Sequence, residues 1–212
     1  MMEVTVLIPA YNEGNTIESI INTLKTIKSI QEVLVINDGS TDNTAELAAK
    51  AGARVISLPK NLGKGAALQK GIDEISSRII IMLDADLIGL NKVHITNLLE
   101  PIYRGEADMT VGVFNHGRGI TDLAQFFSPN LSGQRAVKAE MISDMSSLKK
   151  AGYGVEIAIN QHVKKKGRVK YVDLPDLTHI MKEEKRGIIK GVIARSKMYW
   201  DIFRVLFNKL KV

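Results

Sequence analysis

Asp84 and Asp86 are the residues of this chain best suited to chemistry. They stand one position apart, directly after an apolar run that ends at Leu83. Residues i and i+2 of an extended backbone point the same way, so both carboxylates can face one divalent cation. Carboxylate oxygens are ligands that Mg²⁺ and Mn²⁺ prefer. An isolated Asp-x-Asp is more often a polar strand end before a turn, so the other segments of the chain must decide between the two interpretations.

The elements that carry these residues alternate between strand and helix. Strands are expected over residues 4–8, 33–36, 54–58, 79–83, 109–114 and 169–174, and helices over residues 16–27, 43–51, 66–75, 92–102, 134–149 and 155–164. This alternation predicts an α/β domain with a parallel sheet. Ligands of such sheets bind beyond the carboxyl ends of the strands, which is where Asp84 and Asp86 are expected.

Four segments follow the expected strands, at residues 9–13, 37–42, 61–65 and 84–86. In the third, Gly63 and Gly65 allow the backbone to approach a ligand closely, and Lys64 can neutralise a phosphate. A Walker A loop would need Ser or Thr after the lysine, where Ala66 stands. The dinucleotide-binding fingerprint would need a glycine where Leu68 stands. The sequence therefore argues against a P-loop protein and against a dehydrogenase.

Together, in this order and at this spacing, the four segments resemble the nucleotide-sugar-binding half of the family 2 glycosyltransferases. The resemblance is specific over about residues 3–90 and weaker beyond them. It implies the GT-A fold, a Rossmann-like α/β domain with a mostly parallel central sheet flanked by helices. It also implies transfer of a hexose from a UDP- or GDP-sugar to a hydroxyl or phosphate acceptor, either lipid-linked or a phosphorylated small molecule.

The resemblance assigns roles to individual residues. Asp84 and Asp86 match the family's Asp-x-Asp motif. Mg²⁺ or Mn²⁺ would bridge Asp86, and Asp84 through water or ribose, to the two phosphates and act as a Lewis acid on the leaving diphosphate. The residues expected to bind the nucleotide sugar are Pro9, Ala10, Tyr11, Glu13, Asp38, Gly63, Lys64, Asp84 and Ala85.

Two segments of the second half resemble the acceptor side of these enzymes. Residues 132–135 resemble a short acceptor or donor-sugar loop, and residues 151–157 resemble a Gly-Tyr-x-x-Glu segment at a helix start. The expected catalytic residues are Asp86, Glu156 and Arg135. Glu156 would contact the sugar or the acceptor hydroxyl. The alternative is a structural role, because a helix N-terminus stabilises an anion.

His179 is expected to be the third protein ligand of the metal. In glucosyl-3-phosphoglycerate and mannosylglycerate synthases, a histidine after the last strand completes the metal site. Dolichol-phosphate mannose synthases tend to place a polar side chain two residues past the Asp-x-Asp, where this chain has Ile88. Residues 132–135, however, look more like this lipid-phosphate branch, so retaining and inverting stereochemistry both stay open.

Composition and charge limit the remaining possibilities. The 212 residues suit a glycosyltransferase domain over residues 1–179, with halves at 1–90 and 91–179, and a helical extension over residues 180–212. The chain has no cysteine, which excludes thiolate metal sites and favours a cytoplasmic location. Residues 180–212 contain nine Lys or Arg and three Asp or Glu, so they carry the whole net charge of +6.

The basic extension, residues 180–212, has apolar residues at helical spacing. Such a helix either docks on the sheet domain or on a second copy in a homodimer, or lies peripherally on the anionic inner face of a membrane. Nucleic acid is not expected as a partner, because the aromatic and basic residues match no known reader module.

Two other functions stay open on the sequence alone. A nucleotidyltransferase acting on sugar phosphates also uses paired carboxylates on an open α/β sheet. Its usual glycine-rich basic loop after the first strand is replaced here by residues 9–13. The second alternative is a catalytically silent nucleotide-sugar-binding protein, against which the intact Asp84, Asp86 and Glu156 argue.

Overall fold

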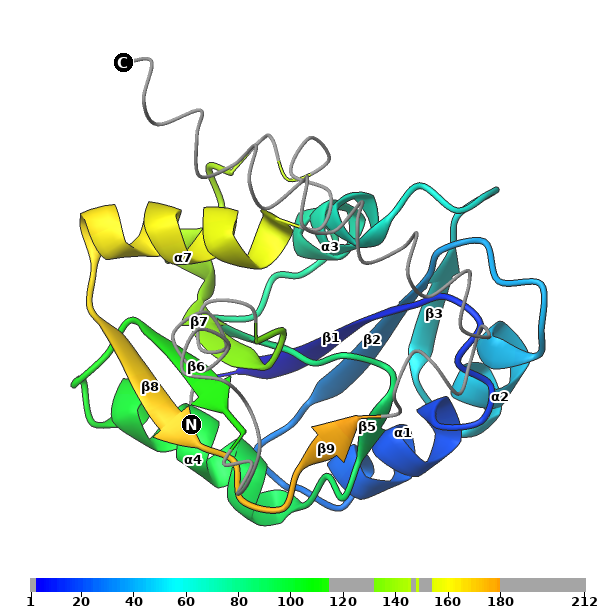
Figure 1. Cartoon of the computed structure of the whole chain (residues 1–212), viewed down its shortest axis with the longest axis horizontal. Coiled ribbons are helices and arrows are strands. Elements are labelled where there is room, and N and C mark those ends of the chain that lie inside the picture. The colour runs from blue at the N-terminus through cyan, green and yellow to red at the C-terminus, as the bar shows by residue number, and fades with distance from the viewer. Residues whose placement is uncertain (1–2, 115–131, 146–147, 149–153, 180–212) are drawn as a thin grey trace, which may run out of the picture.

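The computed structural model describes residues 3–114, 132–145, 148 and 154–179 (Figure 1). Its strands are β1 (Val4–Ala10), β2 (Glu32–Asn37), β3 (Arg54–Ser57), β4 (Ile79–Met82), β5 (Leu87–Ile88), β6 (Met109–Val113), β7 (Arg135–Lys138), β8 (Val169–Asp173) and β9 (Thr178–His179). Its helices are α1 (Ile17–Lys25), α2 (Thr44–Lys50), α3 (Lys64–Asp73), α4 (Lys92–Tyr103), the short 3₁₀-helix η1 (Ala139–Met141) and α7 (Val155–Lys166). The expected basic helix over residues 180–212 lies outside the described residues.

Seven strands form one mixed sheet in the order β3-β2-β1-β4-β7-β6-β8. Strands β3, β2, β1 and β4 run parallel to one another, and β6 and β8 are parallel to each other. Strand β7 lies between β4 and β6 and is antiparallel to both. The predicted α/β fold with a mostly parallel sheet is confirmed. A second, two-stranded sheet pairs β5 with β9 and sets Leu87 opposite His179.

Strand β1 lies in the interior of the sheet and is apolar at every position except the buried Thr5, because both of its faces are covered. Val6 and Ile8 pack into the cluster that includes residues of α1 and α4, whereas Leu7 packs on the opposite face with residues of α3 and α7. Parallel strands covered on both sides read as continuous apolar runs. Figure 1 shows the resulting three layers, with α3 and α7 on one face of the sheet and α1, α2 and α4 on the other.

The helix predicted over residues 134–149 is wrong at its start. Residues Arg135–Lys138 form strand β7, the short 3₁₀-helix η1 follows, and Leu148, near the predicted end, is helical. Ala136 and Val137 are both fully buried, and they belong to the clusters on opposite faces of the sheet. Pairing with β4 and β6 therefore overrides the helical propensity of this segment.

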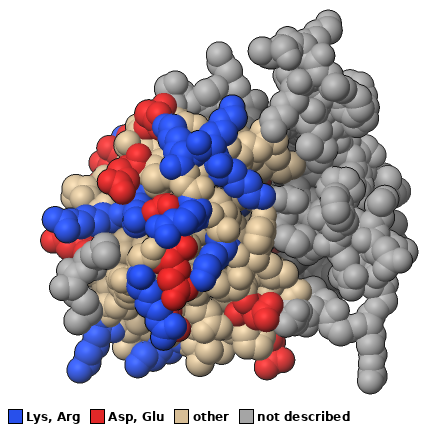
Figure 2. Space-filling model, turned by 90° about the vertical axis from the view of Figure 1, so that its left-hand side faces the viewer, with Lys and Arg blue, Asp and Glu red and all other residues tan. Residues whose placement is uncertain are grey.

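Strand β8 is the edge of the sheet next to the end of α7. Figure 2 views this side of the molecule, where Lys and Arg side chains are interspersed with Asp and Glu. Lys170 of β8 pairs with Glu106 at 2.6 Å, and Lys138 pairs with Asp108 at 2.6 Å. Charged side chains of this kind disfavour pairing of an edge strand with another sheet.

Within the described residues, none of the helices has the length and hydropathy to span a membrane.

Candidate functional site

The expected site segments meet at one edge of the sheet. Strands β1, β2 and β4 are parallel, so the segments that follow them emerge at the same side. Strand β7 runs the opposite way, and its first residue, Arg135, pairs with Met82 at the end of β4. Residues 132–134 consequently enter the sheet where Asp84 leaves it, so β7 brings the second half of the chain to the predicted donor site.

The segment after β1 is held against the segment after β2. Asn12 adopts a left-handed backbone conformation, with φ of 56°, and its side-chain oxygen accepts a hydrogen bond from the Thr41 amide at 2.8 Å. The Ser40 hydroxyl accepts one from the Asn12 amide at 3.0 Å. The expected donor-site residues of this segment differ in exposure: Ala10 is buried, whereas Pro9, Tyr11 and Glu13 are half-buried. The two connected segments form one wall of the site.

Asp38 is buried and organises the start of α3. The residue is 3% exposed, and its carboxylate oxygens accept hydrogen bonds from the amides of Leu62 at 2.7 Å and Gly63 at 2.8 Å. Gly63 has a φ of 91°, a conformation that glycine adopts without strain. Asp38 thus fixes the turn that presents Lys64 at the first position of α3. Its expected contact with the base or ribose stays a prediction.

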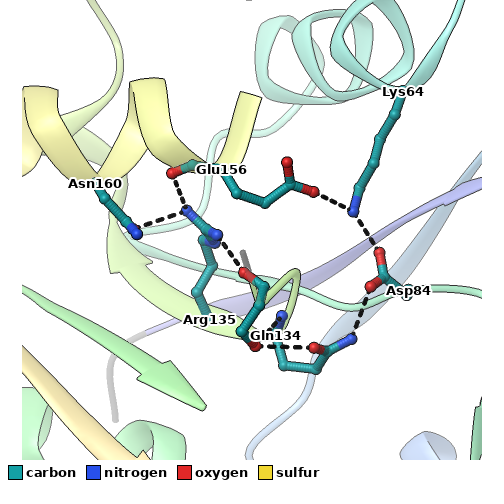
Figure 3. Close-up of polar contacts among 7 residues, drawn as sticks. Lys64, Asp84, Gln134, Arg135, Glu156 and Asn160 are labelled. Atoms are coloured by element: carbon teal, nitrogen blue, oxygen red, sulfur yellow. Dashed lines mark hydrogen bonds and ion pairs between the residues drawn. The ribbon is translucent and has the colours of Figure 1, made fainter. Parts of the chain in front are cut away.

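Lys64 joins the two predicted carboxylate groups of the site. Its Nζ lies 2.5 Å from Oδ1 of Asp84 and 2.5 Å from Oε1 of Glu156, as Figure 3 shows. These residues come from the start of α3, the segment after β4 and the first turn of α7. Glu156 is 7% exposed. The structure therefore brings one ammonium and two carboxyl groups together from segments up to 92 residues apart.

The charges of this group stabilise one another. Burial alone lowers the pKa of Lys64, but the charges of Asp84 and Glu156 outweigh it, so the pKa lies above its ordinary value. Burial alone raises the pKa of Asp84, but the charge and hydrogen bond of Lys64, with a hydrogen bond from Gln134, hold the pKa below its ordinary value. At neutral pH Lys64 is therefore a cation and Asp84 an anion.

The Asp-x-Asp segment is anchored through its middle residue. The carbonyl of Ala85 accepts a hydrogen bond from the Thr16 hydroxyl at 2.6 Å, which ties the segment to the start of α1. Ala85 is buried, whereas Asp86 is half-buried. The pairing of β5 with β9 brings the backbone of His179 opposite Leu87, next in the chain to Asp86. In the described part of the chain, no three His, Cys, Asp or Glu residues gather into a metal cluster.

Arg135 connects residues 132–135 to α7 rather than facing solvent. It is 1% exposed, and its Nη1 donates to the carbonyl of Glu156 at 3.2 Å and to Oδ1 of Asn160 at 3.1 Å. Its Nη2 donates to the carbonyl of Ser132 at 2.5 Å. Burial outweighs the nearby carboxylates and lowers the pKa of Arg135 from its ordinary value. These contacts give Arg135 a positioning role, and its predicted catalytic role stays a prediction.

A small pocket lies between these groups. Six of its lining residues are Pro9, Lys64, Asp84, Gly133, Arg135 and Glu156. Sequence reasoning named five of them as site residues, and Gly133 lies in the 132–135 segment that it singled out. It missed the supporting contacts of Thr16, Gln134 and Asn160, because a hydrogen bond between distant segments leaves no local pattern in the sequence.

Comparison with known proteins places the chain in a family. Residues 5–142 match the model of glycosyl transferase family 2. Glucosyl-3-phosphoglycerate synthase of Mycobacterium tuberculosis is 31% identical over 193 residues, covering 74% of this chain and 59% of that protein. Glycosyltransferase AglJ of Haloferax volcanii is 34% identical over 183 residues, covering 77% of this chain and 59% of that protein. The chain thus spans about three fifths of the length of both relatives.

Solved structures of the mycobacterial synthase are similar throughout the fold. Its complex with Mn²⁺, UDP-glucose and phosphoglyceric acid matches with a TM-score of 0.81 at 26% identity, covering 100% of this chain and 80% of that chain. Its complex with Mg²⁺ and UDP matches with a TM-score of 0.72 at 28% identity, covering 92% and 79%. These similarities confirm the GT-A fold. Because the family model matches well over half of the length of this chain, the chain belongs to glycosyl transferase family 2.

Proposed function

We propose that this protein is a metal-dependent glycosyltransferase that moves a hexose from a UDP-sugar to the hydroxyl of a small phosphorylated acceptor. The observation that carries the proposal is the meeting of Asp84, Lys64 and Glu156, from three separate elements, at the carboxyl edge of the sheet. Asp84 belongs to the predicted donor half and Glu156 to the predicted acceptor half. A reaction that joins a donor to an acceptor needs both halves at one place.

The residues present fit a hard divalent cation. Asp84 and Asp86, separated only by Ala85, offer carboxylate oxygens, and Asp84 already binds a cation, the Lys64 ammonium. We propose that Asp86 holds Mg²⁺ or Mn²⁺, with Asp84 and His179 completing the site. The bound metal supplies a Lewis acid that stabilises the charge on the departing diphosphate.

The chain's own groups would bind and orient the two substrates. Lys64 lies at the N-terminus of α3, where its charge and the helix dipole both favour a phosphate. In the reaction the bond between the anomeric carbon and the diphosphate breaks, with the electron pair leaving on UDP. The acceptor oxygen forms the new bond and loses its proton. Glu156, an acceptor of hydrogen bonds in the same pocket, would hold the sugar or the attacking hydroxyl.

Similarity to the mycobacterial synthase supports the choice of substrates. The solved complex of that enzyme contains UDP-glucose and phosphoglyceric acid together with Mn²⁺. A UDP-sugar and an acceptor of the phosphoglycerate class are therefore our first candidates. A lipid-phosphate acceptor, the other expectation from sequence, and membrane binding through residues 180–212 form the alternative.

Donor binding tests the first part of this proposal. Melting temperature should rise when UDP-glucose and Mn²⁺ are added together, because a ligand that binds the native state stabilises it by mass action. A concentration of 100 Kd would contribute about 2.7 kcal/mol. GDP-mannose with Mn²⁺ is the matched comparison and should give a smaller rise. A larger rise with the GDP-sugar would contradict the UDP assignment.

A further inference from the structure

We infer that Gln134 is a positioning residue for Asp84 and that Ser132 holds the Gln134 side chain in its orientation. The inference rests on the proposed function, because it concerns how the proposed metal and diphosphate site is held. Gln134 belongs neither to the Asp-x-Asp motif nor to the pocket lining, and it would act on substrates only through Asp84.

The hydrogen bonds form a chain that ends on the carboxylate (Figure 3). Nε2 of Gln134 donates to Oδ2 of Asp84 at 2.9 Å, and the Ser132 hydroxyl donates to Oε1 of Gln134 at 3.0 Å. The Gln134 backbone amide in turn donates to the Ser132 hydroxyl oxygen at 3.3 Å. Gln134 is 1% exposed and Ser132 is 6% exposed, so water competes little for these bonds.

The chemistry of the groups fixes the direction of the chain. An ionised carboxylate only accepts hydrogen bonds, so the amide nitrogen of Gln134 must face Asp84. A flipped amide would set its oxygen against the carboxylate and its nitrogen against the Ser132 hydroxyl oxygen. Because a serine hydroxyl can donate or accept, the carboxylate alone selects the amide orientation, and the hydrogen bond from Ser132 then holds the amide in that place.

The backbone leaves this segment little freedom to shift. The carbonyl of Gln134 accepts a hydrogen bond from the Gly112 amide at 2.8 Å, next to strand β7. Continuing the register of β4 and β7 sets Gly133 opposite Asp84, and a Cβ atom at Gly133 would overlap that carboxylate. Gly133, which has no side chain, therefore lets this segment lie close to Asp84, and Gln134 donates a hydrogen bond to the carboxylate.

Both oxygens of Asp84 are consequently oriented by protein donors. Lys64 binds Oδ1 and Gln134 binds Oδ2, so rotation of the carboxylate group is restricted from both sides. Lys64 is also expected to bind the diphosphate, whereas Gln134 is not expected to bind a substrate. Gln134 would thus keep the carboxylate plane fixed when Lys64 turns to its ligand. Removal of partners that orient metal-site carboxylates typically weakens metal affinity about 10- to 100-fold.

The test is calorimetric titration of UDP in the presence of saturating Mn²⁺, on the full chain and without acceptor. Gln134→Leu removes the donor at similar size, and it should weaken UDP binding by about 10- to 100-fold. Ser132→Ala removes only the hydroxyl and should weaken binding by a smaller factor. The double variant should match Gln134→Leu, because Ser132 acts through Gln134.

Gln69→Leu is the matched control. Gln69 is also buried, on α3, and its amide donates to Asp73 at 3.0 Å, away from Asp84. This variant should lose stability but bind UDP within about twofold of the wild type, which separates positioning from a general effect of burying leucine. Wild-type affinity in Gln134→Leu would overturn the inference. Additive losses in the double variant would overturn the role of Ser132.

Asp86→Ala in the same titration separates this inference from the proposed function. Unchanged Mn²⁺-dependent UDP binding in Asp86→Ala would overturn the proposed metal site. Loss of binding in Asp86→Ala with wild-type binding in Gln134→Leu would overturn the positioning inference alone. If Gln134→Leu does not fold, the comparison of Ser132→Ala with the wild type decides, and an unchanged affinity there rejects the inference.

Discussion

Lys64 keeps two carboxylates together that would otherwise repel each other. Its ammonium lies 2.5 Å from both Asp84 and Glu156, and Glu156 is the more deeply buried of the two. Without the cation, one of the acids would have to take up a proton or move into solvent. At the scale of single residues, Lys64 therefore links donor and acceptor halves before any substrate arrives.

The variant Lys64→Met keeps the aliphatic stem and removes the charge. We expect the free energy of unfolding at pH 7 to fall by roughly 1–3 kcal/mol, less than for a fully buried pair because Lys64 and Asp84 are 29% and 30% exposed. Because the pKa of Asp84 is lowered in the folded protein, its contribution is present above the unfolded pKa, about 3.9, and is lost as pH falls. The difference between wild type and variant should therefore shrink below about pH 4.

Urea unfolding at pH 7 and at low pH measures both effects. Lys70→Met is the control, since Lys70 lies on the same helix and forms an exposed pair with Glu74. This control should change stability little at either pH. Equal losses in the two variants, or a Lys64→Met loss that does not depend on pH, would contradict the account.

Single residues show what sequence can and cannot predict about a site. Asp84, Lys64 and Glu156 were named from motifs, and the structure brings them together. Asp38 was also named, but the sequence could not reveal that both its oxygens bind the amides of Leu62 and Gly63. A motif indicates that a carboxylate is needed at a position, whereas its partners depend on how distant segments meet.

At the scale of elements, Arg135 fastens strand β7 to helix α7. Its guanidinium, which carries five donors in one rigid plane, donates to three acceptors, on Ser132, Glu156 and Asn160. These contacts hold the first turn of α7, and with it Glu156, against the segment that supports Asp84. Arg135 is therefore one of the buried residues that set the geometry of the site.

Arg135→Lys keeps the charge but cannot reach all three acceptors. Since a hydrogen bond to a charged group contributes about 1.5–3 kcal/mol, we expect a loss of roughly 2–4 kcal/mol in the free energy of unfolding. Chemical denaturation measures it. Arg104→Lys, at an exposed pair with Glu100 on α4, is the control and should change stability little. A loss at Arg135 no larger than that at Arg104 would show that the guanidinium plane is not needed.

Strand β7 explains why prediction succeeded for one part of the fold and failed for another. Strand β4 is a continuous apolar run and β1 is interrupted only by Thr5, and such runs identify buried strands whatever surrounds them. Residues Arg135–Lys138 have two apolar residues flanked by Arg and Lys, and their strand forms only because β4 and β6 lie on either side. Long-range pairing of this kind is not visible in local composition.

At the scale of the whole molecule, the candidate site lies where the two halves of the chain meet. The first half was predictable from four segments that follow its strands, because parallel strands bring such segments to one edge. The second half reaches that edge through an antiparallel strand, which no periodicity indicated. Membrane binding or docking by residues 180–212 stays a prediction from their charge and spacing alone.

Transfer of sugar tests the central claim most directly. The full chain is incubated with labelled UDP-glucose, phosphoglyceric acid and Mn²⁺, and the labelled product is identified by mass. We predict labelled glucosylated phosphoglycerate with release of UDP from the wild type, and no product from folded Asp86→Ala or in excess chelator. Undiminished product from Asp86→Ala or with chelator, or release of inorganic pyrophosphate in place of UDP, would contradict a metal-dependent glycosyltransferase.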